Sequence, residues 1–501
     1  MKKRRQTTND GFNQSRMTGG WHRSIGLLCL ALTAAIAAPA QDQQPAPDAV
    51  VFKTLASFNG TNGTYPELGL VQGLDGNFYG TGFFGGDASN DGTVWKMTPD
   101  GTLTAIYTFC SLPNCTDGAL PNQNGILALG TDGNFYGMAA GVGGANGDGT
   151  IFKITPSGTL TTLYNLTSFN EAASNGVIRG TDGNFYGSNP IGGNNIFKIT
   201  PAGAYSVLYT FCSQPNCTDG TYPTNPLLSG ADGNLYGTTV GGGANGYGTI
   251  FKLTPSGKLT TLHSFDTDVF GYEYCVNGYC APMVQASNGN FYGTTSSGGT
   301  NFYAPLGAGA GTFFEITPAG AFRTLYNFCS QPNCADGALP EVFVQATDGN
   351  FYGVTSNGGS TDQGTLFKID AAGTLTTLHN CGFGDCAYPT GLIQATNGTF
   401  YGVDVGGGCC NGGTVFSLSV GLGPFVETLP ASAKAGATIK ILGANLTGAT
   451  AVSFNGVTAA FTVKSRTLIS ATVPTGATSG FVTVTTPSGT LQSNVKFHVR
   501  P

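Results

Sequence analysis

The sequence of 501 residues predicts an all-β fold: a seven-bladed β-propeller of four-stranded blades, closed by its N-terminal strand and followed by a β-sandwich. The main observation is an anchor phrase, DGNFYG or a close variant, that occurs seven times. Its copies begin at Asp75, Asp132, Asp182, Asp232, Asn288, Asp348 and Asn397, at intervals of 49 to 60 residues, a period typical of propeller blades. The 79 glycines and only 10% charged residues also indicate short strands joined by tight turns.

Residues 1–40 have the pattern of a secretory signal peptide. Six lysines and arginines precede an apolar run from Ile25 to Ala40, which closes on the small residues Ala38-Pro39-Ala40. We expect Sec-type export, cleavage after Ala40, a linker over residues 41–50, and a secreted or cell-surface protein. The run is short for a membrane span, so no membrane insertion is expected after cleavage. An uncleaved anchor is the alternative.

The charge of the mature chain disfavours anionic partners. Without residues 1–40 the chain keeps 15 basic and 26 acidic residues, a net charge of −11. Such a chain repels nucleic acid and anionic membrane surfaces. No nucleic-acid partner is therefore expected.

Each repeat contains four short segments that alternate β-branched and aromatic residues, as in the stretch from Gly125 to Leu166. Asp132-Gly133 joins the first two segments and suits a tight hairpin turn. Residues 155–158 join the last two through a Thr-Pro-Ser-Gly turn. Both short connections fall on one side, here named the short-turn face, and the two longer connections fall on the opposite, long-loop face. Ligand binding is expected on the long-loop face.

The seventh repeat lacks its fourth segment after Leu418. The missing segment is found at the start of the mature chain, where Val51 to Phe58 aligns with fourth segments such as Leu259 to Phe265. We therefore predict a propeller over residues 51–421 in which the N-terminal strand is the outer strand of the last blade and leaves no free edge. A linear stack of β units is the alternative.

Twelve of the 13 cysteines lie in the mature chain. Ten form pairs with four residues between partners: Cys110/Cys115, Cys212/Cys217, Cys275/Cys280, Cys329/Cys334 and Cys381/Cys386. In an exported protein these pairs predict local disulfides. The adjacent Cys409 and Cys410 are expected to form a vicinal disulfide, with two free thiols as the alternative. A metal held by four thiolates would need two pairs close together, so no metal site is expected.

Three linkers follow their second cysteine with an Asp-Gly pair, at Asp117, Asp219 and Asp336. On a ring these carboxylates would take equivalent positions on the long-loop face, where they could bind Ca²⁺ or sugar hydroxyls. The alternative is that Asp-Gly is turn chemistry. The repeated Phe-Tyr pairs favour packing between blades over a sugar-stacking platform. The lysines that recur in the third segments, such as Lys96, are expected along blade edges with solvated head groups.

No catalytic residue is predicted. The mature chain has only His263, His379 and His498, and neither a GxSxG nor an HExxH motif. No cofactor is expected beyond the Ca²⁺ ion considered above. A glycosidase or lyase that uses only carboxylates, tyrosine and lysine stays open.

Two family resemblances follow from the motifs. Residues 424–501 contain ILGANL, VSFNGV and ATVPTGATSGFVTVTTPSG, and this segment resembles the IPT/TIG family of immunoglobulin-like domains. The resemblance implies an Ig-like β-sandwich that acts as an extracellular spacer or interaction module. The repeats DGNFYG, GGANGYGTIFKLTPSG and LTTLHSF resemble the GloVer (Gloeo/Verruco) tandem repeat of exported bacterial proteins, over about residues 51–420.

These observations favour an exported, non-enzymatic binding or structural protein that recognises a polysaccharide or a cell-surface protein through the long-loop face. The rival hypothesis is a carbohydrate-active enzyme, either a glycosidase or a polysaccharide lyase, on the same scaffold.

Overall fold

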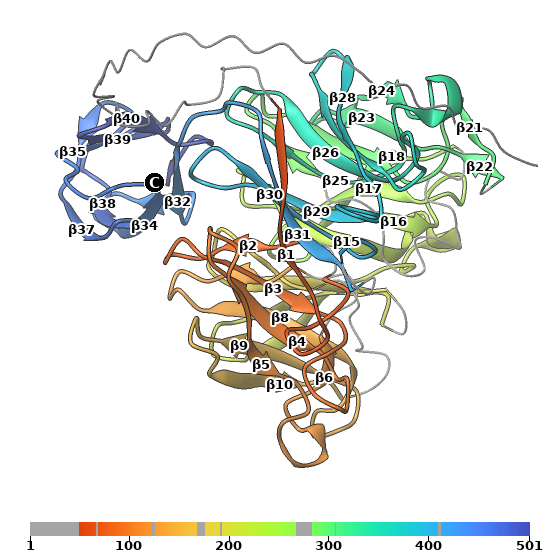
Figure 1. Ribbon diagram of the computed structural model, residues 1–501, viewed down its shortest axis with the longest axis horizontal. Helices are drawn as coiled ribbons and strands as arrows, with labels where there is room; N and C mark the ends of the chain where they lie inside the picture. Colours follow the sequence, from red (N-terminus) through yellow and green to blue (C-terminus); the bar gives the residue numbers. More distant parts are fainter. Residues whose placement is uncertain are drawn as a thin grey trace, which may run out of the picture. The chain divides into compact units, whose positions relative to one another are not determined.

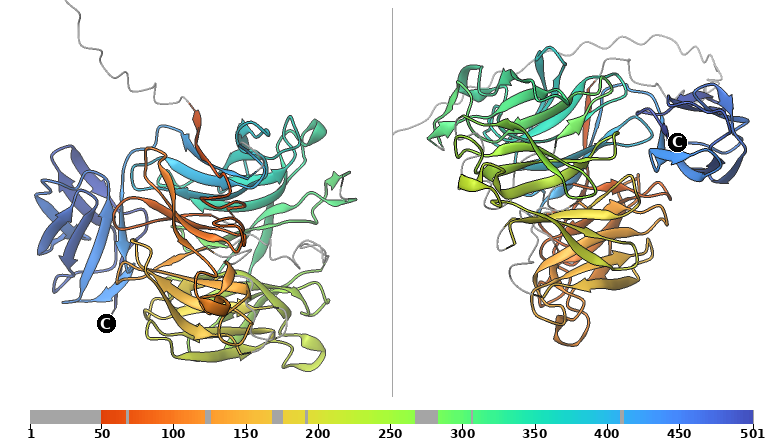
Figure 2. Two further views of the ribbon diagram at one scale, coloured as in Figure 1. Left: turned by 60° about the horizontal axis from the view of Figure 1, so that its bottom comes forward. Right: turned by 180° about the vertical axis from the view of Figure 1, so that it is seen from behind.

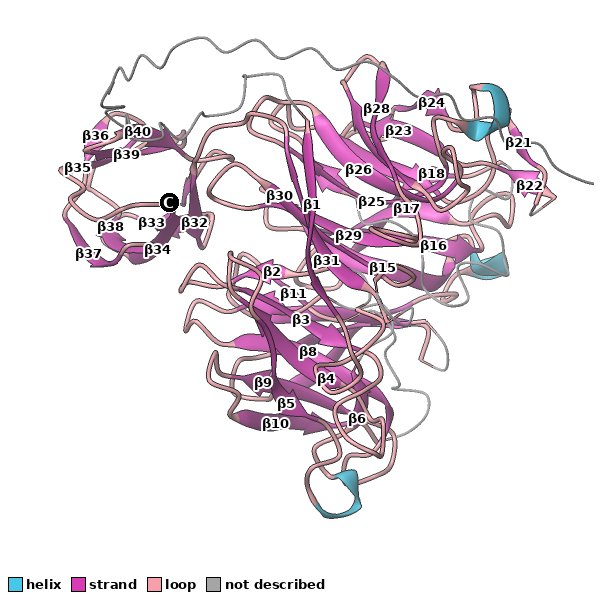
Figure 3. Ribbon diagram, in the orientation of Figure 1, coloured by secondary structure: helices cyan, strands magenta, loops and turns pink. Residues whose placement is uncertain are grey.

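The computed structural model describes residues 50–66, 69–121, 126–167, 176–190, 193–266, 283–305, 307–408 and 412–500 (Figure 1). This part of the chain is built of strands and loops. Its helical elements are three short 3-10 turns, η1 (Pro113–Cys115), η3 (Pro215–Cys217) and η4 (Pro332–Cys334) (Figure 3). The prediction of an all-β chain is confirmed.

The described residues between 51 and 419 form seven antiparallel sheets of four or five strands, and each sheet holds one copy of the anchor phrase (Figure 2). The first contains β2 (Val71–Gln72), β3 (Phe78–Gly82), β4 (Thr93–Met97) and β5 (Leu103–Thr108). The second contains β6 (Ala119–Pro121), β7 (Ala128–Leu129), β8 (Phe135–Val142), β9 (Thr150–Ile154) and β10 (Leu160–Asn165). The third contains β11 (Ile178–Arg179), β12 (Phe185–Asn189), β13 (Asn195–Ile199) and β14 (Tyr205–Thr210).

The remaining four sheets repeat this order. The fourth contains β15 (Thr221–Ser229), β16 (Leu235–Gly241), β17 (Thr249–Leu253) and β18 (Leu259–Ser264). The fifth contains β19 (Val284–Gln285), β20 (Phe291–Thr295), β23 (Thr312–Ile316) and β24 (Phe322–Asn327), with a small hairpin of β21 (Phe302–Tyr303) and β22 (Ala308–Gly309) in its long loop. The sixth contains β25 (Ala338–Gln345), β26 (Phe351–Asn357), β27 (Thr365–Ile369) and β28 (Leu375–Asn380). The seventh contains β29 (Pro389–Gln394), β30 (Phe400–Asp404), β31 (Thr414–Ser419) and β1 (Val51–Ser57).

The N-terminal strand β1 pairs with β31, the third strand of the last repeat. The pairing is antiparallel and runs from Val51 opposite Ser419 to Ser57 opposite Thr414. Figure 1 shows β1 in red among the blue strands of the last sheet. The predicted completion of the last sheet by the strand from Val51 is therefore present in the structure.

The anchor phrase packs one sheet against the next. Each anchor tyrosine lies on the anchor phenylalanine of the following repeat, with ring centroids 3.9 to 4.5 Å apart. The last tyrosine, Tyr401, lies on Phe78 of the first sheet at 4.1 Å. In one repeat the phenylalanine is replaced by Leu235, which shares a buried cluster with Tyr186. These contacts agree with packing between sheets as the role of the Phe-Tyr pairs.

Residues 426–500 form a separate β-sandwich. One sheet contains β32 (Val426–Leu429), β34 (Thr438–Gly443), β38 (Leu468–Thr472) and β37 (Phe461–Ser465), and the other contains β36 (Val457–Thr458), β35 (Ala451–Phe454), β39 (Val482–Thr486) and β40 (Gly489–Gln492). A parallel pair of β33 (Ser432–Lys434) and β41 (His498–Arg500) completes it. Inward side chains of both sheets form one buried apolar core that includes Ile441, Val452 and Val484. This arrangement is a two-layer antiparallel sandwich.

Candidate functional site

The carboxylate of Asp219, one of the three predicted ligand residues, is 1% exposed and bonded within its own loop. Its Oδ2 accepts hydrogen bonds from the hydroxyls of Tyr209 at 2.8 Å and Ser213 at 2.9 Å, and from the Ser213 backbone N–H at 3.0 Å. The backbone N–H of Gln214 donates to Oδ1 at 3.4 Å. Burial alone would raise the pKa of Asp219, but the Tyr209 and Ser213 hydrogen bonds outweigh it and lower the pKa.

Asp117 and Asp336 repeat this arrangement. Both are fully buried, and each accepts a hydrogen bond of 2.7 Å from the tyrosine that occupies the place of Tyr209. The following serine and the next backbone N–H complete each set. The three carboxylates therefore have their acceptor positions filled from inside the protein, which supports the turn alternative. Binding of Ca²⁺ or sugar by these three residues stays an untested prediction.

The sixth linker uses a histidine in place of the tyrosine. His379 Nε2 lies 2.9 Å from Oδ2 of Asp385, whose Oδ1 accepts the backbone N–H groups of Gly382 and Cys386, each at 2.7 Å. The imidazole also stacks on Phe52 of β1 with ring centroids 4.0 Å apart. A carboxylate that accepts hydrogen bonds within the cysteine loop thus occurs with two different partners, and Asp385 is only half-buried.

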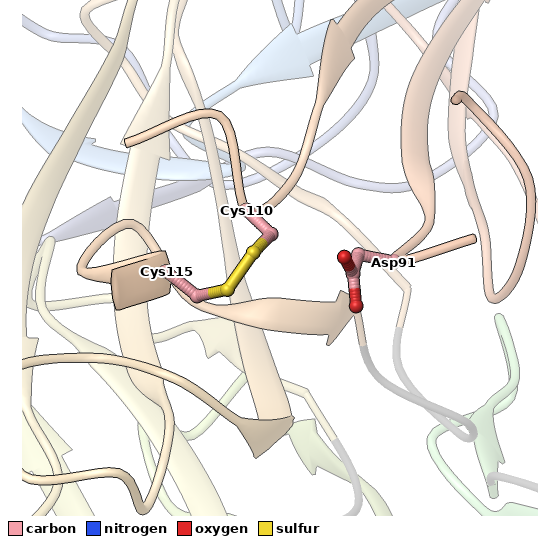
Figure 4. A group of neighbouring side chains, drawn as sticks. All are labelled: Asp91, Cys110 and Cys115. Atoms are coloured by element: carbon pink, nitrogen blue, oxygen red, sulfur yellow. A yellow bond between two sulfur atoms is a disulfide. The ribbon is translucent and has the colours of Figure 1, made fainter. Parts of the chain in front are cut away.

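Four of the predicted cysteine pairs are at disulfide distance. They are Cys110–Cys115, Cys212–Cys217, Cys329–Cys334 and Cys381–Cys386, with Cα atoms 4.0 to 5.0 Å apart. Cys275, Cys280, Cys409 and Cys410 lie outside the described residues. Figure 4 shows Asp91 beside the Cys110–Cys115 disulfide. Because these sulfurs are bonded to each other, they offer no thiolate ligand to a metal in this oxidised form.

The lysines of the third strands differ from their expected place. Lys96, Lys198, Lys252 and Lys368 pair with the anchor aspartates of their own sheets at 2.9 to 3.5 Å. Register explains the contact, because each lysine lies directly opposite the anchor tyrosine on the second strand, as Lys252 lies opposite Tyr236. Burial alone would raise the pKa of Asp232, but hydrogen bonds from Lys252, Asn234 and Tyr236 lower it to about 2.

The two repeats with an anchor asparagine lack this lysine. In the fifth sheet Glu315 takes the lysine position and accepts hydrogen bonds from the Tyr292 hydroxyl at 2.9 Å and the Asn290 amide at 2.6 Å. In the seventh sheet Ser417 takes that position. Loss of the aspartate therefore coincides with loss of the cation, as expected when each needs the other. This charge cluster has a structural role in the sheet.

In five repeats, one residue with left-handed backbone lies at or before the inner strand, on the long-loop face. In each case it precedes proline and has φ between 51° and 56°, at Tyr65, Leu120, Tyr222, Leu339 and Tyr388. Each backbone N–H donates to the loop before the third strand of the preceding sheet, at 2.7 to 3.0 Å. Bulky residues avoid this conformation at a cost of about 1–2 kcal/mol. The bonds between neighbouring sheets therefore hold these side chains in fixed positions.

Among the described residues, the long-loop face carries exposed aromatic and apolar side chains and no lysine or arginine. The exposed side chains are Tyr65, Leu112, Tyr222, Tyr247, Phe302 and Phe383. Every lysine and arginine between residues 50 and 421 lies in the half of its sheet next to the short turns. Exposed carboxylates of the long loops include Asp87 and Asp362. This face therefore offers aromatic surfaces and hydrogen-bond acceptors without cations.

A cavity of about 450 Å³, here named the central cavity, lies at the opposite ends of the inner strands. Its lining combines apolar residues from the first four sheets and from the sixth and seventh, such as Val71, Leu127 and Ile393, with Leu429 and Leu442 of the sandwich. This position differs from the long-loop face on which the sequence placed ligand binding. An apolar cavity of this size with few polar groups has the character of a small-molecule site.

Two charged side chains line the central cavity, Arg179 of β11 and Glu427 of β32. Burial lowers the pKa of the Arg179 guanidinium, and Glu427 opposes this effect. Burial raises the pKa of the Glu427 carboxyl, and Arg179 opposes that shift. The Glu427 side chain is itself exposed, so this burial effect is weak. Neither residue was predicted from the sequence.

One sequence signal points to Arg179. It stands three residues before the anchor phrase. Four other repeats have a glutamine at this position: Gln72, Gln285, Gln345 and Gln394. Those glutamines bond to the backbone of a neighbouring sheet, as Gln72 Oε1 accepts the backbone N–H of Thr396 at 3.0 Å. Arg179 replaces a glutamine that most repeats have at this position. It therefore departs from the structural role that the glutamines share.

Solved structures with similar backbones include lyases. Virginiamycin B lyase from Staphylococcus aureus has 15% identity and a TM-score of 0.50, with 74% of this chain and 99% of that chain covered. A catalytically inactive variant of that lyase with quinupristin has 16% identity and a TM-score of 0.51, with the same coverage. A streptogramin B lyase has 15% identity and a TM-score of 0.50, with 74% and 98% covered. At such identity the likeness concerns the fold alone, and no curated protein matches the chain.

The fold and the repeats define a class of propeller-like repeat proteins with an appended sandwich. The model of the Gloeobacter/Verrucomicrobia repeat matches residues 44–217, 195–341 and 276–462, and the IPT/TIG domain matches residues 426–499. The chain belongs to the Gloeobacter/Verrucomicrobia repeat family and carries a C-terminal IPT/TIG domain. Both resemblances read from the sequence are confirmed. In the described residues no helix is long and apolar enough to cross a membrane.

Proposed function

We propose that this chain is an exported, non-enzymatic binding protein, built on a closed seven-bladed propeller, that recognises a polysaccharide through its long-loop face. A cell-surface protein is the second class of partner for the same face. The observation that carries the proposal is the fixed set of exposed aromatic side chains on a face without lysine or arginine.

Contacts between the last and the first sheet support the closed ring. Tyr401 lies on Phe78, and Gln72 accepts the backbone N–H of Thr396, as between other neighbouring sheets. A Cβ atom on Gly413 would lie 2.6 Å from Pro66, so the first inner strand approaches the last sheet closely. The same kinds of contact join consecutive repeats, which is what a ring of seven equivalent blades requires.

The chemistry of the long-loop face favours a neutral sugar polymer. Pyranose rings present apolar C–H faces that stack on aromatic side chains, and their hydroxyls donate to carboxylates. Rigid aromatic groups lose little conformational entropy on binding. Anionic polymers would meet carboxylates without compensating cations, so they are poor ligands here.

Export is supported by the four cysteine pairs at disulfide distance, since such bonds persist in oxidising compartments. The predicted signal peptide over residues 1–40 lies outside the described residues. Short loops closed by a disulfide and a buried carboxylate keep the long-loop face rigid, which suits recognition of an extended polymer.

The rival function is a glycosidase or lyase. Such an enzyme commonly needs two carboxyl groups about 5 to 9.5 Å apart around the scissile bond. The central cavity has one carboxylate in its described lining, Glu427. Product analysis therefore separates the two functions: a binder leaves the glycan intact, whereas an enzyme releases shorter or unsaturated products.

The experiment is a screen of the mature protein on a glycan array, followed by affinity measurements on the best neutral glycan. Tyr65→Leu and Tyr222→Leu remove the aromatic rings, and leucine is a compatible replacement because Leu120 and Leu339 occupy the equivalent positions. We expect each to weaken binding by about 1–2 kcal/mol, roughly 5- to 30-fold. Val207→Ala, at an exposed apolar residue of β14, is the control. Equal affinity in all variants would refute the proposed face.

A further inference from the structure

We propose that the central cavity binds a small organic anion with an apolar body, with Arg179 as the counter-charge. This site lies at the short-turn ends of the inner strands, so it is independent of the long-loop face. The cavity holds about 450 Å³, within the range of small-molecule sites. The ligand class is an amphipathic monocarboxylate.

The guanidinium of Arg179 has no hydrogen bond and no ion pair in the part of the chain that the structure describes. The glutamines at the equivalent repeat positions are different, because their amides are used within the protein. Gln345, for example, donates to the Gly349 carbonyl at 3.0 Å and accepts the Ser287 backbone N–H at 2.8 Å. Arg179 therefore keeps five N–H donors available to whatever enters the cavity.

Glu427 does not occupy the N–H donors of Arg179. It is the other charged residue of the lining, and the two side chains interact electrostatically without forming an ion pair within 4.0 Å. The cavity therefore carries a local positive charge at Arg179 with a second polar group facing the same space.

A carboxylate is the anion that matches this arrangement best. The planar guanidinium pairs with carboxylate oxygens through two parallel N–H donors, and the pair is stronger when water is excluded. Most of the remaining lining is apolar, such as Leu70, Leu129, Ile178 and Val344, and its uncharged polar residues are Gln72, Gln345, Gln394 and Asn494. An alkyl chain or another apolar body covers such a surface favourably. A free inorganic anion would leave that surface without a partner.

The test uses the mature full chain and decanoate as the probe, measured by titration calorimetry, with 1-decanol as the uncharged analogue of the same chain length. We expect decanoate to bind at least tenfold more tightly than decanol. Arg179→Gln, which introduces the residue of the equivalent positions, should weaken decanoate at least tenfold and leave decanol unchanged. Arg323→Gln removes an arginine from β24 outside the cavity lining, and it should leave decanoate binding unchanged.

Three results would overturn the proposal: no binding of decanoate, equal binding of decanoate and decanol, or equal decanoate affinity in the wild type and Arg179→Gln. Either of the first two results would indicate a solvent-filled cavity or a purely apolar one. The circular dichroism spectrum and thermal midpoint establish whether each variant folds. If Arg179→Gln does not fold, Arg179→Lys replaces it, and the comparison of the two probes on the wild type decides the question.

Discussion

The Asp219→Asn substitution separates a structural from a ligand-binding role of the linker carboxylates. The amide can still accept one backbone N–H, but its NH₂ group faces the hydroxyls of Tyr209 and Ser213, which now donate to Oδ2. Each hydrogen bond to a charged group contributes about 1.5–3 kcal/mol. Allowing for reorientation of the hydroxyls, we expect a local loss of about 2–4 kcal/mol.

Amide hydrogen exchange at Ser213 and Gln214 measures this loss directly, because both N–H groups donate to Asp219. A local cost of about 2–4 kcal/mol corresponds to protection lowered roughly 30- to 1000-fold. Asp148→Asn, at a half-buried carboxylate in a neighbouring long loop, is the matched control and should change protection little. Unchanged protection in Asp219→Asn, together with lost Ca²⁺ or glycan affinity, would refute the structural reasoning.

The same carboxylate predicts the pH dependence of the loop. The pKa of Asp219 is lowered in the folded protein, so its stabilising contribution is fully present above the unfolded value of about 3.9. The contribution is lost as the pH falls through the lower folded pKa. Protection at Ser213 should therefore decrease in acid in the wild type. Asp219→Asn should lack that step, and an equal acid step in both proteins would contradict the assignment.

Three further predictions concern the sheets and the cysteines. Deletion of residues 50–58 exposes the edge of β31, so we expect oligomers in light scattering and a lower thermal midpoint; an unchanged monomer would contradict this. Asp232→Asn should cost about 1 kcal/mol, because it leaves Lys252 without its partner, and adding Lys252→Ser should recover part of that cost. A double-mutant cycle by urea denaturation measures the coupling, and strictly additive effects would count against it. Mass spectrometry after non-reducing alkylation should find no free thiol, whereas two alkylated cysteines would show that Cys409 and Cys410 are reduced.

The repeat architecture could be predicted because its signals are local and recur. Hairpin turns, strand length and alternation stand within each repeat, and seven copies reinforce one another. The place of β1 was also predictable, because the segment missing after Leu418 has the same pattern as Val51 to Phe58. Both inferences compare one part of the sequence with another and need no knowledge of distant contacts.

The charge clusters and the central cavity depend on information that is not local. Lys96 meets Asp75 only because strand register places it opposite Tyr79, and the pattern of β4 by itself suggests a solvated edge. Glu427 is the exposed residue of a sandwich strand whose other residues are buried. Its surroundings depend on residues of the inner strands, such as Arg179. No local sequence pattern predicts that two such segments lie next to each other.

The pairing of β1 with β31 sets the order in which this chain can mature. A ribosome releases Val51 more than 350 residues before its partner Ser419, so β1 has to remain without that partner while six repeats are made. Contacts this distant in sequence form slowly, and unpaired strands are prone to wrong association during that interval. Early arrest of synthesis therefore yields a product with two incomplete ends, and joining of the first and last strands is the step that completes the final sheet.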